Sequence, residues 1–307
     1  MRRVLAATLM SALVAGMACA QETPAGDGAS DASASDTSVS QTPGTGSPDD
    51  GSDPFEAGYA AFASGDYGKA LLHWEPLVEE GDPRAQYNVG ILYAQGQGVP
   101  HDMAIAMDLW LKAARQNHVR AAHNLALALL AGEPADAQGQ LHAPDTAQAV
   151  KWLEIGVNAG YANSEYTLGK LFAEGIGVNR DPARAAELFL MAAEQGFARA
   201  QYNLGKIYRD GEGVPKNPEL SIHWFREAAE RGHSRAQDKL ADRYARGDGV
   251  QQDDIEALKW AILAAAHGYA PAAERRNELR ARMPEESVME AERRAADFHP
   301  REGAVED

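Results

Sequence analysis

The chain has 307 residues, and its 45 Asp and Glu outnumber its 29 Lys and Arg, so its formal net charge is −16 at pH 7. This acidic excess argues against broad binding of nucleic acid or of an anionic lipid surface. The single cysteine, Cys19, excludes an internal disulfide and a thiolate metal cluster.

Residues 1–20 have the pattern of a secretory signal peptide. A basic pair precedes an apolar run that is too short for a good membrane-spanning helix, and the small residues Ala18 and Ala20 form a cleavage site. We therefore expect a periplasmic or secreted bacterial protein without a transmembrane segment. Lipid anchoring through Cys19 is a weaker alternative, because Gly16 is a poor first residue for a lipobox.

Residues 21–54 contain no aromatic residue, no Lys or Arg, and seven acidic residues. Such a composition cannot bury enough apolar surface to order itself, and it predicts a disordered acidic tether rich in Ser, Asp, Gly and Pro. The alternative is a recognition segment or a glycosylated stalk. Leaving out the two arginines of the signal peptide and these seven acids, the rest of the chain has a net charge of −11.

From residue 55 onward the chain repeats itself with a period of 36 residues. A small residue that follows a large apolar one recurs at Gly90, Ala126, Gly169, Gly205 and Ala241, with seven extra residues in one loop. A period of this length indicates stacked supersecondary units. We predict an all-α fold: a right-handed α-solenoid of about six helix-turn-helix hairpins, with a C-terminal capping helix, over residues 55–283. A charged helix and tail follow over residues 284–307.

Each unit carries signals for two helices. The first helix is expected to end at a Gly-x-Gly-Val loop, which begins at Gly96, Gly175, Gly211 or Gly247. The second helix is expected to begin after a capping side chain, at Asp66, Asp102, Asp145, Asp181, Asn217 and Asp253. It is expected to end at Gly81, Asn117, Gly160, Gly196, Gly232 and Gly268.

The second helices also repeat a large residue four positions before an Ala-Ala pair or its equivalent. These residues are Leu109 (beside Trp110), Trp152, Leu188, Trp224 and Trp260. A ladder of tryptophans can serve as a ligand platform. We favour packing between hairpins, because one tryptophan buries on the order of 200 Å².

The Ala-x-x-x-Leu-Gly segment, the Gly-x-Gly-Val loop, the capping Asp and the Trp-x-x-x-Ala-Ala-x-x-Gly segment together resemble the Sel-like repeat, a longer-looped relative of the tetratricopeptide repeat. The resemblance covers residues 55–269. Three parts depart from it: a first hairpin with a short turn, the unit with the longer loop, and a last helix with charged residues at apolar positions. The first and last departures are typical of end caps.

The resemblance implies a concave groove that binds extended peptides through four positions of each first helix. Mapped by spacing, the candidate peptide-binding residues are Arg84, Tyr87, Asn88, Arg120, Asn124, Tyr166, Lys170, Arg199, Tyr202, Asn203, Lys206 and Arg235. Asparagine offers a donor and an acceptor to a peptide backbone, and Arg199, Asn203, Lys206 and Arg235 can seat a carboxylate. The alternative is structural, because Tyr and Asn at these positions can also bond neighbouring helices. The loop at residues 133–144 is a second candidate surface or a neutral elaboration.

We find no sequence motif for catalysis. The Gly-x-Ser-x-Gly, His-Glu-x-x-His and Ser-x-x-Lys patterns and the phosphate-binding loop are absent from the sequence, and its nine histidines show no metal-ligand spacing. We predict a non-enzymatic, monomeric protein without cofactor or metal, which binds a protein or peptide as an adaptor or regulator. The alternatives are a cell-wall hydrolase or penicillin-binding activity, as linked to cysteine-rich relatives, and a scaffold for polysaccharide or cell-wall machinery.

Overall fold

The computed structural model describes residues 53–132 and 144–301, which form fourteen helices and no strand. The predicted signal peptide, nearly all of the predicted tether and most of the loop at residues 133–144 lie outside these residues. Pro54, predicted as the last tether residue, is the first residue of helix α2, and Asp53 caps this helix by accepting a hydrogen bond from the Phe55 N–H at 3.0 Å. The described chain divides into two compact units, which meet in the sequence between His118 and Val119.

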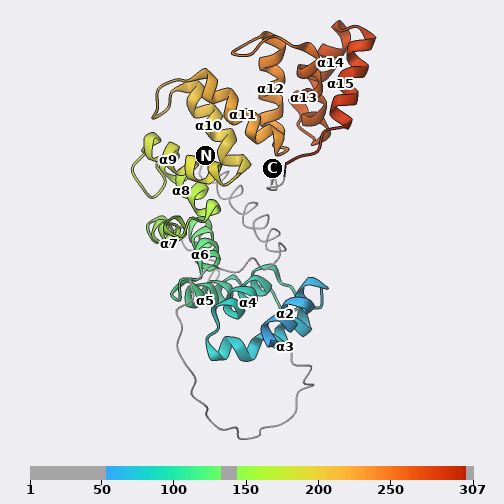
Figure 1. The fold of residues 1–307 in the computed structure, drawn as a ribbon. Helices are drawn as coiled ribbons and strands as arrows, with labels where there is room; N and C mark the ends of the chain where they lie inside the picture. Colours follow the sequence, from blue (N-terminus) through green and yellow to red (C-terminus); the bar gives the residue numbers. More distant parts are fainter. Residues whose placement is uncertain (1–52, 133–143, 302–307) are drawn as a thin grey trace, which may run out of the picture. The chain divides into compact units, whose positions relative to one another are not determined.

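The first unit consists of two helical hairpins (Figure 1). Its helices are α2 (Pro54–Ala63), α3 (Tyr67–Glu80), α4 (Pro83–Gln95) and α5 (Met103–Ala114). Trp74 on α3 and Trp110 on α5 are fully buried, and Trp74 belongs to the hydrophobic core cluster of this unit.

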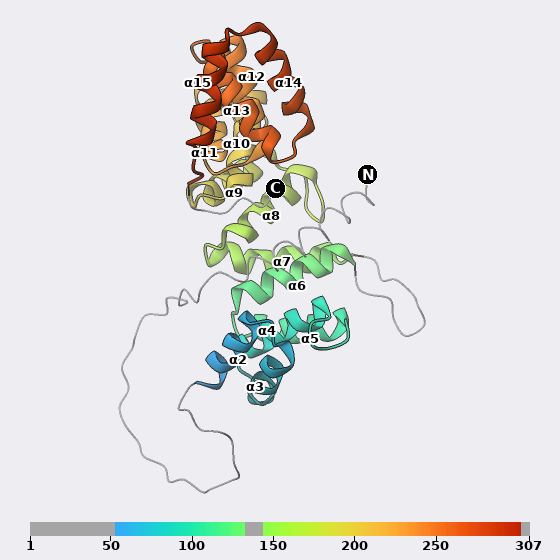
Figure 2. The same ribbon diagram turned by 90° about the vertical axis from the view of Figure 1, so that its right-hand side faces the viewer.

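The second unit continues the pattern with four more hairpins and two further helices, stacked in sequence order (Figures 1 and 2). Its helices are α6 (Val119–Ala131), α7 (Thr146–Asn158), α8 (Ala162–Glu174), α9 (Pro182–Glu194), α10 (Ala198–Asp210), α11 (Pro218–Glu230), α12 (Ser234–Arg246), α13 (Asp254–Ala266), α14 (Ala270–Arg282) and α15 (Glu285–Ala296). Each helix packs mainly against its neighbours in the chain, as expected of an α-solenoid.

The predicted helix boundaries are confirmed. All six predicted capping residues accept hydrogen bonds from the first turn of their helices; Asp181 Oδ1, for example, accepts from the Arg184 N–H at 3.0 Å. The glycines predicted to end helices have positive φ, and so does Asn117, with φ 64°. Asn117 is the only non-glycine residue with positive φ in the described part of the chain.

Close packing within a hairpin depends on a small residue of the first helix that lies against an aromatic ring of the second. A Cβ atom added at Gly205 would lie 2.5 Å from Phe225 Cδ1, and one added at Gly90 would lie 2.5 Å from Trp110 Nε1. Trp110 also donates its ring N–H to the Tyr87 carbonyl at 3.2 Å. The glycines are therefore required by contact with the rings and not by backbone conformation.

The predicted position of the core aromatics is only partly correct. Leu109, Leu188 and Trp260 are buried, but Trp152 and Trp224 are only half-buried. In the α10–α11 hairpin the ring against the small residue belongs to Phe225, one position later. One residue turns a helix by about 100°, so the two neighbouring positions face different neighbours.

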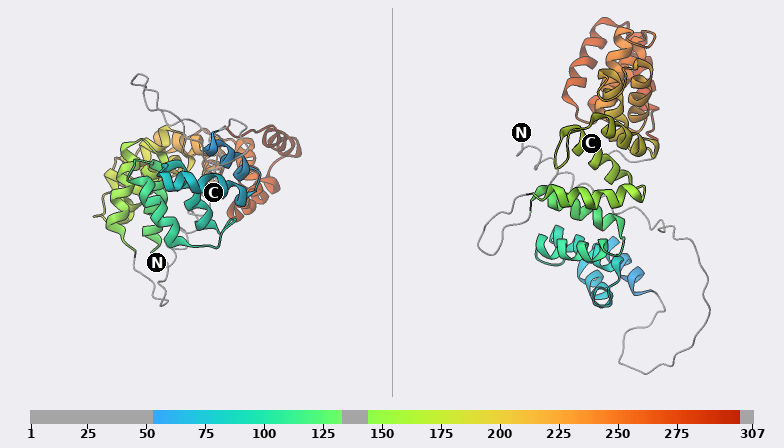
Figure 3. Two further views of the ribbon diagram at one scale, coloured as in Figure 1. Left: turned by 90° about the horizontal axis from the view of Figure 1, so that it is seen from below. Right: turned by 90° about the vertical axis from the view of Figure 1, so that its left-hand side faces the viewer.

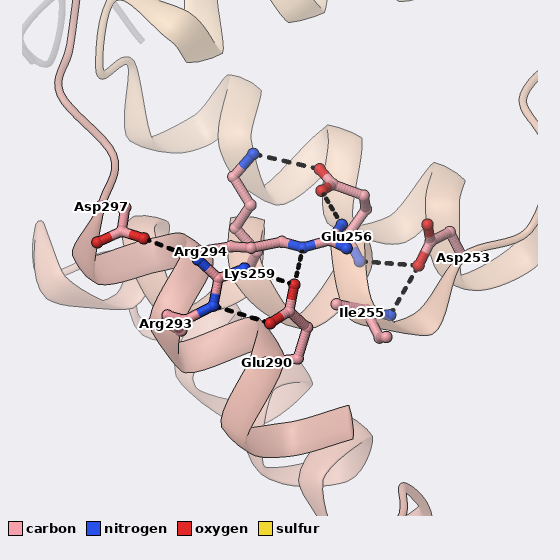
Figure 4. Close-up of polar contacts among 8 residues, drawn as sticks. All are labelled: Asp253, Ile255, Glu256, Lys259, Glu290, Arg293, Arg294 and Asp297. Carbon is pink, nitrogen blue, oxygen red and sulfur yellow. Dashed lines mark hydrogen bonds and ion pairs between the residues drawn. The ribbon is translucent and has the colours of Figure 1, made fainter. Parts of the chain in front are cut away.

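Helix α15 is part of the core of the second unit, although the sequence interpretation set it apart from the repeats. Val288, Ala291 and Ala295 lie on one face of α15 and are buried. This helix packs against α13 (Figure 2), and the orange and red helices at the C-terminal end of the second unit lie together in Figure 3 as well. At the surface of this contact, Arg294 bonds both Glu256 of α13 and Glu290 of its own helix at 2.8 Å (Figure 4).

The segment after α15 runs back to α11. The Phe298 ring packs edge-on against Trp260, with 5.5 Å between ring centroids. The Arg301 N–H donates to the Glu230 carbonyl at 2.8 Å, and the Arg301 guanidinium also pairs with the carboxylates of Glu227 and Glu230. The described chain thus ends in contact with the end of α11.

Candidate functional site

The candidate peptide-binding residues on α8, α10 and α12 of the second unit form a polar stripe across three successive first helices. We call the following set the polar stripe: Tyr166 and Lys170 on α8, Arg199, Tyr202, Asn203 and Lys206 on α10, and Arg235 on α12. Because these residues occupy equivalent positions of successive repeats, the stacking of the hairpins brings them into one row.

Tyr166 and Asn203 join neighbouring repeats. The Tyr166 side chain is hydrogen-bonded to Asn203, one repeat further on. Burial raises the pKa of Tyr166, while the positive charges of Arg199 and Arg235 and the bond to Asn203 act in the opposite direction. Two arginines of successive first helices therefore lie near one tyrosine hydroxyl, whose phenol stays neutral at physiological pH.

Tyr202 repeats this environment one unit later. Its ring stacks on His233, with 4.7 Å between centroids and 21° between planes, and Lys206 Nζ lies 5.9 Å from the ring centroid. Burial raises the pKa of Tyr202, and the charge of Arg235 opposes this shift. Tyr87 and His118 make an equivalent stack at 4.7 Å in the first unit, and the sequence interpretation missed both pairs.

The candidate residues of the first unit serve its packing. Tyr87 is buried, with 7% of its surface exposed. Asn88 donates to the Arg84 carbonyl at 2.9 Å, and Arg84 pairs with Asp82 and lies 4.2 Å from the centre of the Phe55 ring.

The candidate residues of α6 differ from each other. Arg120 is exposed, whereas Asn124 is buried, with 7% of its surface exposed. Tyr87 and Asn124 thus lie in the core, where their side chains have almost no surface for an extended peptide.

The polar stripe is followed, on its C-terminal side, by an ion network of Asp238, Asp242 and Arg275. Asp238 and Asp242 of α12 stand where the preceding repeat has Tyr202 and Lys206. Arg275 of α14 donates to Asp238 at 3.0 Å and to Asp242 at 2.7 Å, and the Asp238 side chain is only 2% exposed. The sequence interpretation explained Arg276, Asn277 and Arg280 of this last helix as end-cap residues. It did not single out Arg275, whose carboxylate partners lie one repeat earlier.

Two buried titratable groups lie near the start of the stripe. His123 Nδ1 is 3.1 Å from Ser164 Oγ, and Ser164 is fully buried. The neighbouring Glu165 is also buried and accepts a hydrogen bond from Gln195 Nε2 at 2.8 Å. Burial raises the pKa of Glu165. The Ser-His pair has the residue types of a nucleophile and its base, but both groups are shielded from a substrate.

His123 is expected to make the protein sensitive to acid. Burial lowers the pKa of His123 to about 4, against an ordinary value of 6.5. The unfolded chain therefore binds a proton at a higher pH than the folded chain, so stability is full above about pH 6.5 and falls as the pH drops towards 4, by about 3 kcal/mol for this group. Glu165, with its raised pKa, acts in the opposite direction.

Urea denaturation between pH 4 and pH 7 measures this effect. We expect His123→Gln to lose less stability on acidification than the parent protein, because its side chain does not titrate. Identical pH profiles of the two proteins would contradict the role of His123.

The described residues contain no group of three or more His, Cys, Asp or Glu side chains placed to hold a metal ion. Over the same ranges, no helix has both the length and the apolar character needed to cross a membrane.

The hairpins described above define the class of the protein, an α-solenoid of short helical repeats. The family profile of the Sel1 repeat matches five consecutive stretches, residues 83–118, 119–161, 162–197, 198–233 and 234–269. These stretches cover more than half of the chain, which therefore belongs to the Sel1 repeat family. The hairpin α2–α3 and the helices α14 and α15 lie outside the match.

Similar proteins agree with this assignment. The crystal structure of a Sel1 repeat protein from Oxalobacter formigenes superposes with a TM-score of 0.66 at 28% identity, over 83% of this chain and 100% of that one. A protective antigen of uropathogenic Escherichia coli with the same type of fold gives a TM-score of 0.50 at 23% identity, over 80% of this chain and 60% of the antigen. A chitin synthase regulator from Malassezia restricta is 33% identical over 125 residues, which are 40% of this chain and 8% of that relative.

Proposed function

We propose that this protein is a non-catalytic adaptor or regulator that binds another protein, or an extended segment of one, through the polar stripe. The Sel1 repeat fold supports a protein-interaction module. The observation that carries the proposal is the row of side chains from α8, α10 and α12, in which arginines of successive repeats lie near Tyr166.

We propose that the protein acts in the bacterial envelope. Its support is the signal-peptide pattern of residues 1–20. The relative from Malassezia restricta is named as a regulator of chitin synthase, and this name favours a regulatory over a catalytic role for a similar stretch of repeats.

The test is capture of a partner from envelope extract, followed by titration of the purified partner against two variants. The stripe variant carries Arg199→Ala, Lys206→Ala and Arg235→Ala and keeps Asn203, whose bond to Tyr166 is structural. The control variant carries the same number of charge removals on second helices and loops, at Lys151, Arg180 and Arg184.

We expect the stripe variant to bind its partner at least about tenfold more weakly, because interface energy is concentrated in a few residues. The control variant is expected to bind like the parent protein. Equal affinity of the parent protein and of a fully helical stripe variant would refute the assignment of the binding surface.

A further inference from the structure

The segment that follows α15 carries two side chains that dock onto second helices. We call residues 297–301 the C-terminal strap. Phe298 is half-buried and packs edge-on against Trp260 of α13, whereas His299 and Pro300 are exposed. Arg301 pairs with two carboxylates of α11 and donates its backbone N–H to a carbonyl of the same helix. The strap is therefore held by one aromatic residue and by an arginine three positions later.

The acidic part of this dock departs from the repeat pattern. Glu227 of α11 stands where the neighbouring second helices have apolar residues, which are Ile155, Met191 and Leu263. Its carboxylate lies 2.9 Å from the guanidinium of Arg231 and 3.3 Å from that of Arg301. Burial raises the pKa of Glu227, but the bond to Arg231 and the charges of both arginines lower it overall. An ionised carboxylate thus replaces an apolar side chain at the place where the strap arrives.

The aromatic part of the dock differs from its counterpart one repeat earlier. Trp260 is only 4% exposed, whereas Trp224, the equivalent residue of α11, is half-buried. Phe298 supplies part of the cover of Trp260, because it packs against the core cluster to which Trp260 belongs. Since Phe298 and Arg301 are three residues apart, one short extended segment reaches both parts of the dock, over about 10 Å of backbone.

The contacts of the strap are of a kind that exchanges readily. The Arg301 side chain is 55% exposed, and ion pairs at such exposure contribute little stability because water solvates both partners. The strap stays in place because it is tied to α15, whose buried face packs on α13. A tether of this kind acts as a high local concentration of the strap and does not require strong contacts. A separate segment with the same two side chains therefore competes with it.

We propose that α11 and α13 form a second docking site, for a segment of another protein that carries an aromatic residue and, three positions later, an arginine. The aromatic ring of the partner packs against Trp260, and its arginine pairs with Glu227 and Glu230. The C-terminal strap occupies the site as an internal competitor. The site is built from second helices, whereas the polar stripe belongs to first helices, so the inference is independent of the binding surface proposed above.

The test measures binding of a labelled strap peptide to the full chain by fluorescence anisotropy. The peptide has the sequence of residues 295–301 with an amidated end, and a second peptide has Ala and Gln in place of its Phe and Arg. The strap variant of the protein carries Phe298→Ala and Arg301→Ala. The site variant adds Glu227→Gln and Glu230→Gln. The control variant, Met289→Ala with Arg282→Ala, removes one exposed apolar side chain and one ion-paired arginine elsewhere in the same region.

We expect the strap variant to bind the strap peptide at least about tenfold more tightly than the parent protein, with an affinity that falls as salt rises. The parent protein and the control variant are expected to bind it equally weakly, and the site variant is expected to lose the gain. Equal binding by the parent protein and a fully helical strap variant, or equal binding of the two peptides, would overturn the inference. A dimer that the parent protein forms and the strap variant does not would assign the site to strap exchange between copies and would exclude an external partner.

Hydrogen exchange of the parent protein gives a second measurement that needs no variant. The Arg301 amide donates to the Glu230 carbonyl, so its protection reports the docked strap. We expect this amide to exchange at least about tenfold faster than the amides in the middle of α15, and faster still with excess strap peptide. Exchange at the rate of α15, unchanged by the peptide, would mean that the strap opens only with its helix and would contradict an exchangeable competitor.

Discussion

Replacing Arg275 by methionine is expected to lower the free energy of unfolding by up to about 3–5 kcal/mol, because the change leaves the buried Asp238 with only the more distant Lys239, at 3.8 Å, as a counter-charge. Arg275 bonds Asp238 at 3.0 Å and Asp242 at 2.7 Å. Methionine keeps the length of the side chain, so the loss reports mainly the removal of the guanidinium from the buried carboxylate. Because repeat arrays unfold in parts, hydrogen exchange at the amides of α12 and α14 is the suitable measurement.

The control and the rescue use residues of the same helices. Arg276→Met removes a neighbouring guanidinium, which bonds the side chain of Asn277, and is expected to cost less than about 0.5 kcal/mol. Adding Asp238→Asn to Arg275→Met removes the buried charge and is expected to restore much of the lost stability. If the double variant is no more stable than Arg275→Met, the buried charge is not the cause of the loss.

Phe225→Ala is expected to destabilise the second unit by a similar amount, about 3–5 kcal/mol. The ring is fully buried against Gly205, where a Cβ atom would lie 2.5 Å from Phe225 Cδ1. Gly205→Ala alone is expected to cost about 1–3 kcal/mol through overpacking, less the gain in helix propensity.

A double-mutant cycle tests this contact. Gly205→Ala combined with Phe225→Ala is expected to cost less than the sum of the single changes, since the new methyl group occupies space that the ring has left. The chain contains this combination in its next hairpin, where Ala241 and Ala261 take the equivalent positions and are both buried. Additive losses, measured by urea denaturation followed by circular dichroism, would contradict direct contact between the two positions.

The helix boundaries could be predicted from the sequence because their signals are local. A capping carboxylate such as Asp145 needs only the N–H groups that follow it, and Asn117 needs only its own backbone conformation. Because the same capping and terminating residues recur in successive repeats, their repetition distinguished them from chance occurrences.

Contacts between different helices were harder to predict than the helix boundaries. Trp224 and Phe225 point in directions about 100° apart around α11, so only one of them can face the small residue of α10. The spacing to the Ala-Ala pair does not determine which one does. The burial of Asn124 and the pairing of Arg275 with Asp238 depend on neighbouring helices. The packing of α15 was missed because its charged residues outnumber the three small or apolar residues that form its buried face.

For the candidate site, the sequence mapping assigned equivalent residues of successive repeats, and their role in binding remains a prediction. Tyr166, Asn203 and Arg235 come together as the spacing implied. The aromatic stack of Tyr202 on His233 was missed, although the same spacing joins Tyr87 to His118 and Tyr166 to Phe197.

Gly90 with Trp110, Gly169 with Phe189 and Gly205 with Phe225 are each separated by the same number of residues within one hairpin. Duplication or loss of one whole repeat in the gene therefore keeps the glycine and its aromatic ring together and preserves this contact within each hairpin. The side chains of the polar stripe meet across hairpins, so every such event creates a new junction with its own surface chemistry. In this architecture the length of the array and its choice of partner can thus evolve at different rates.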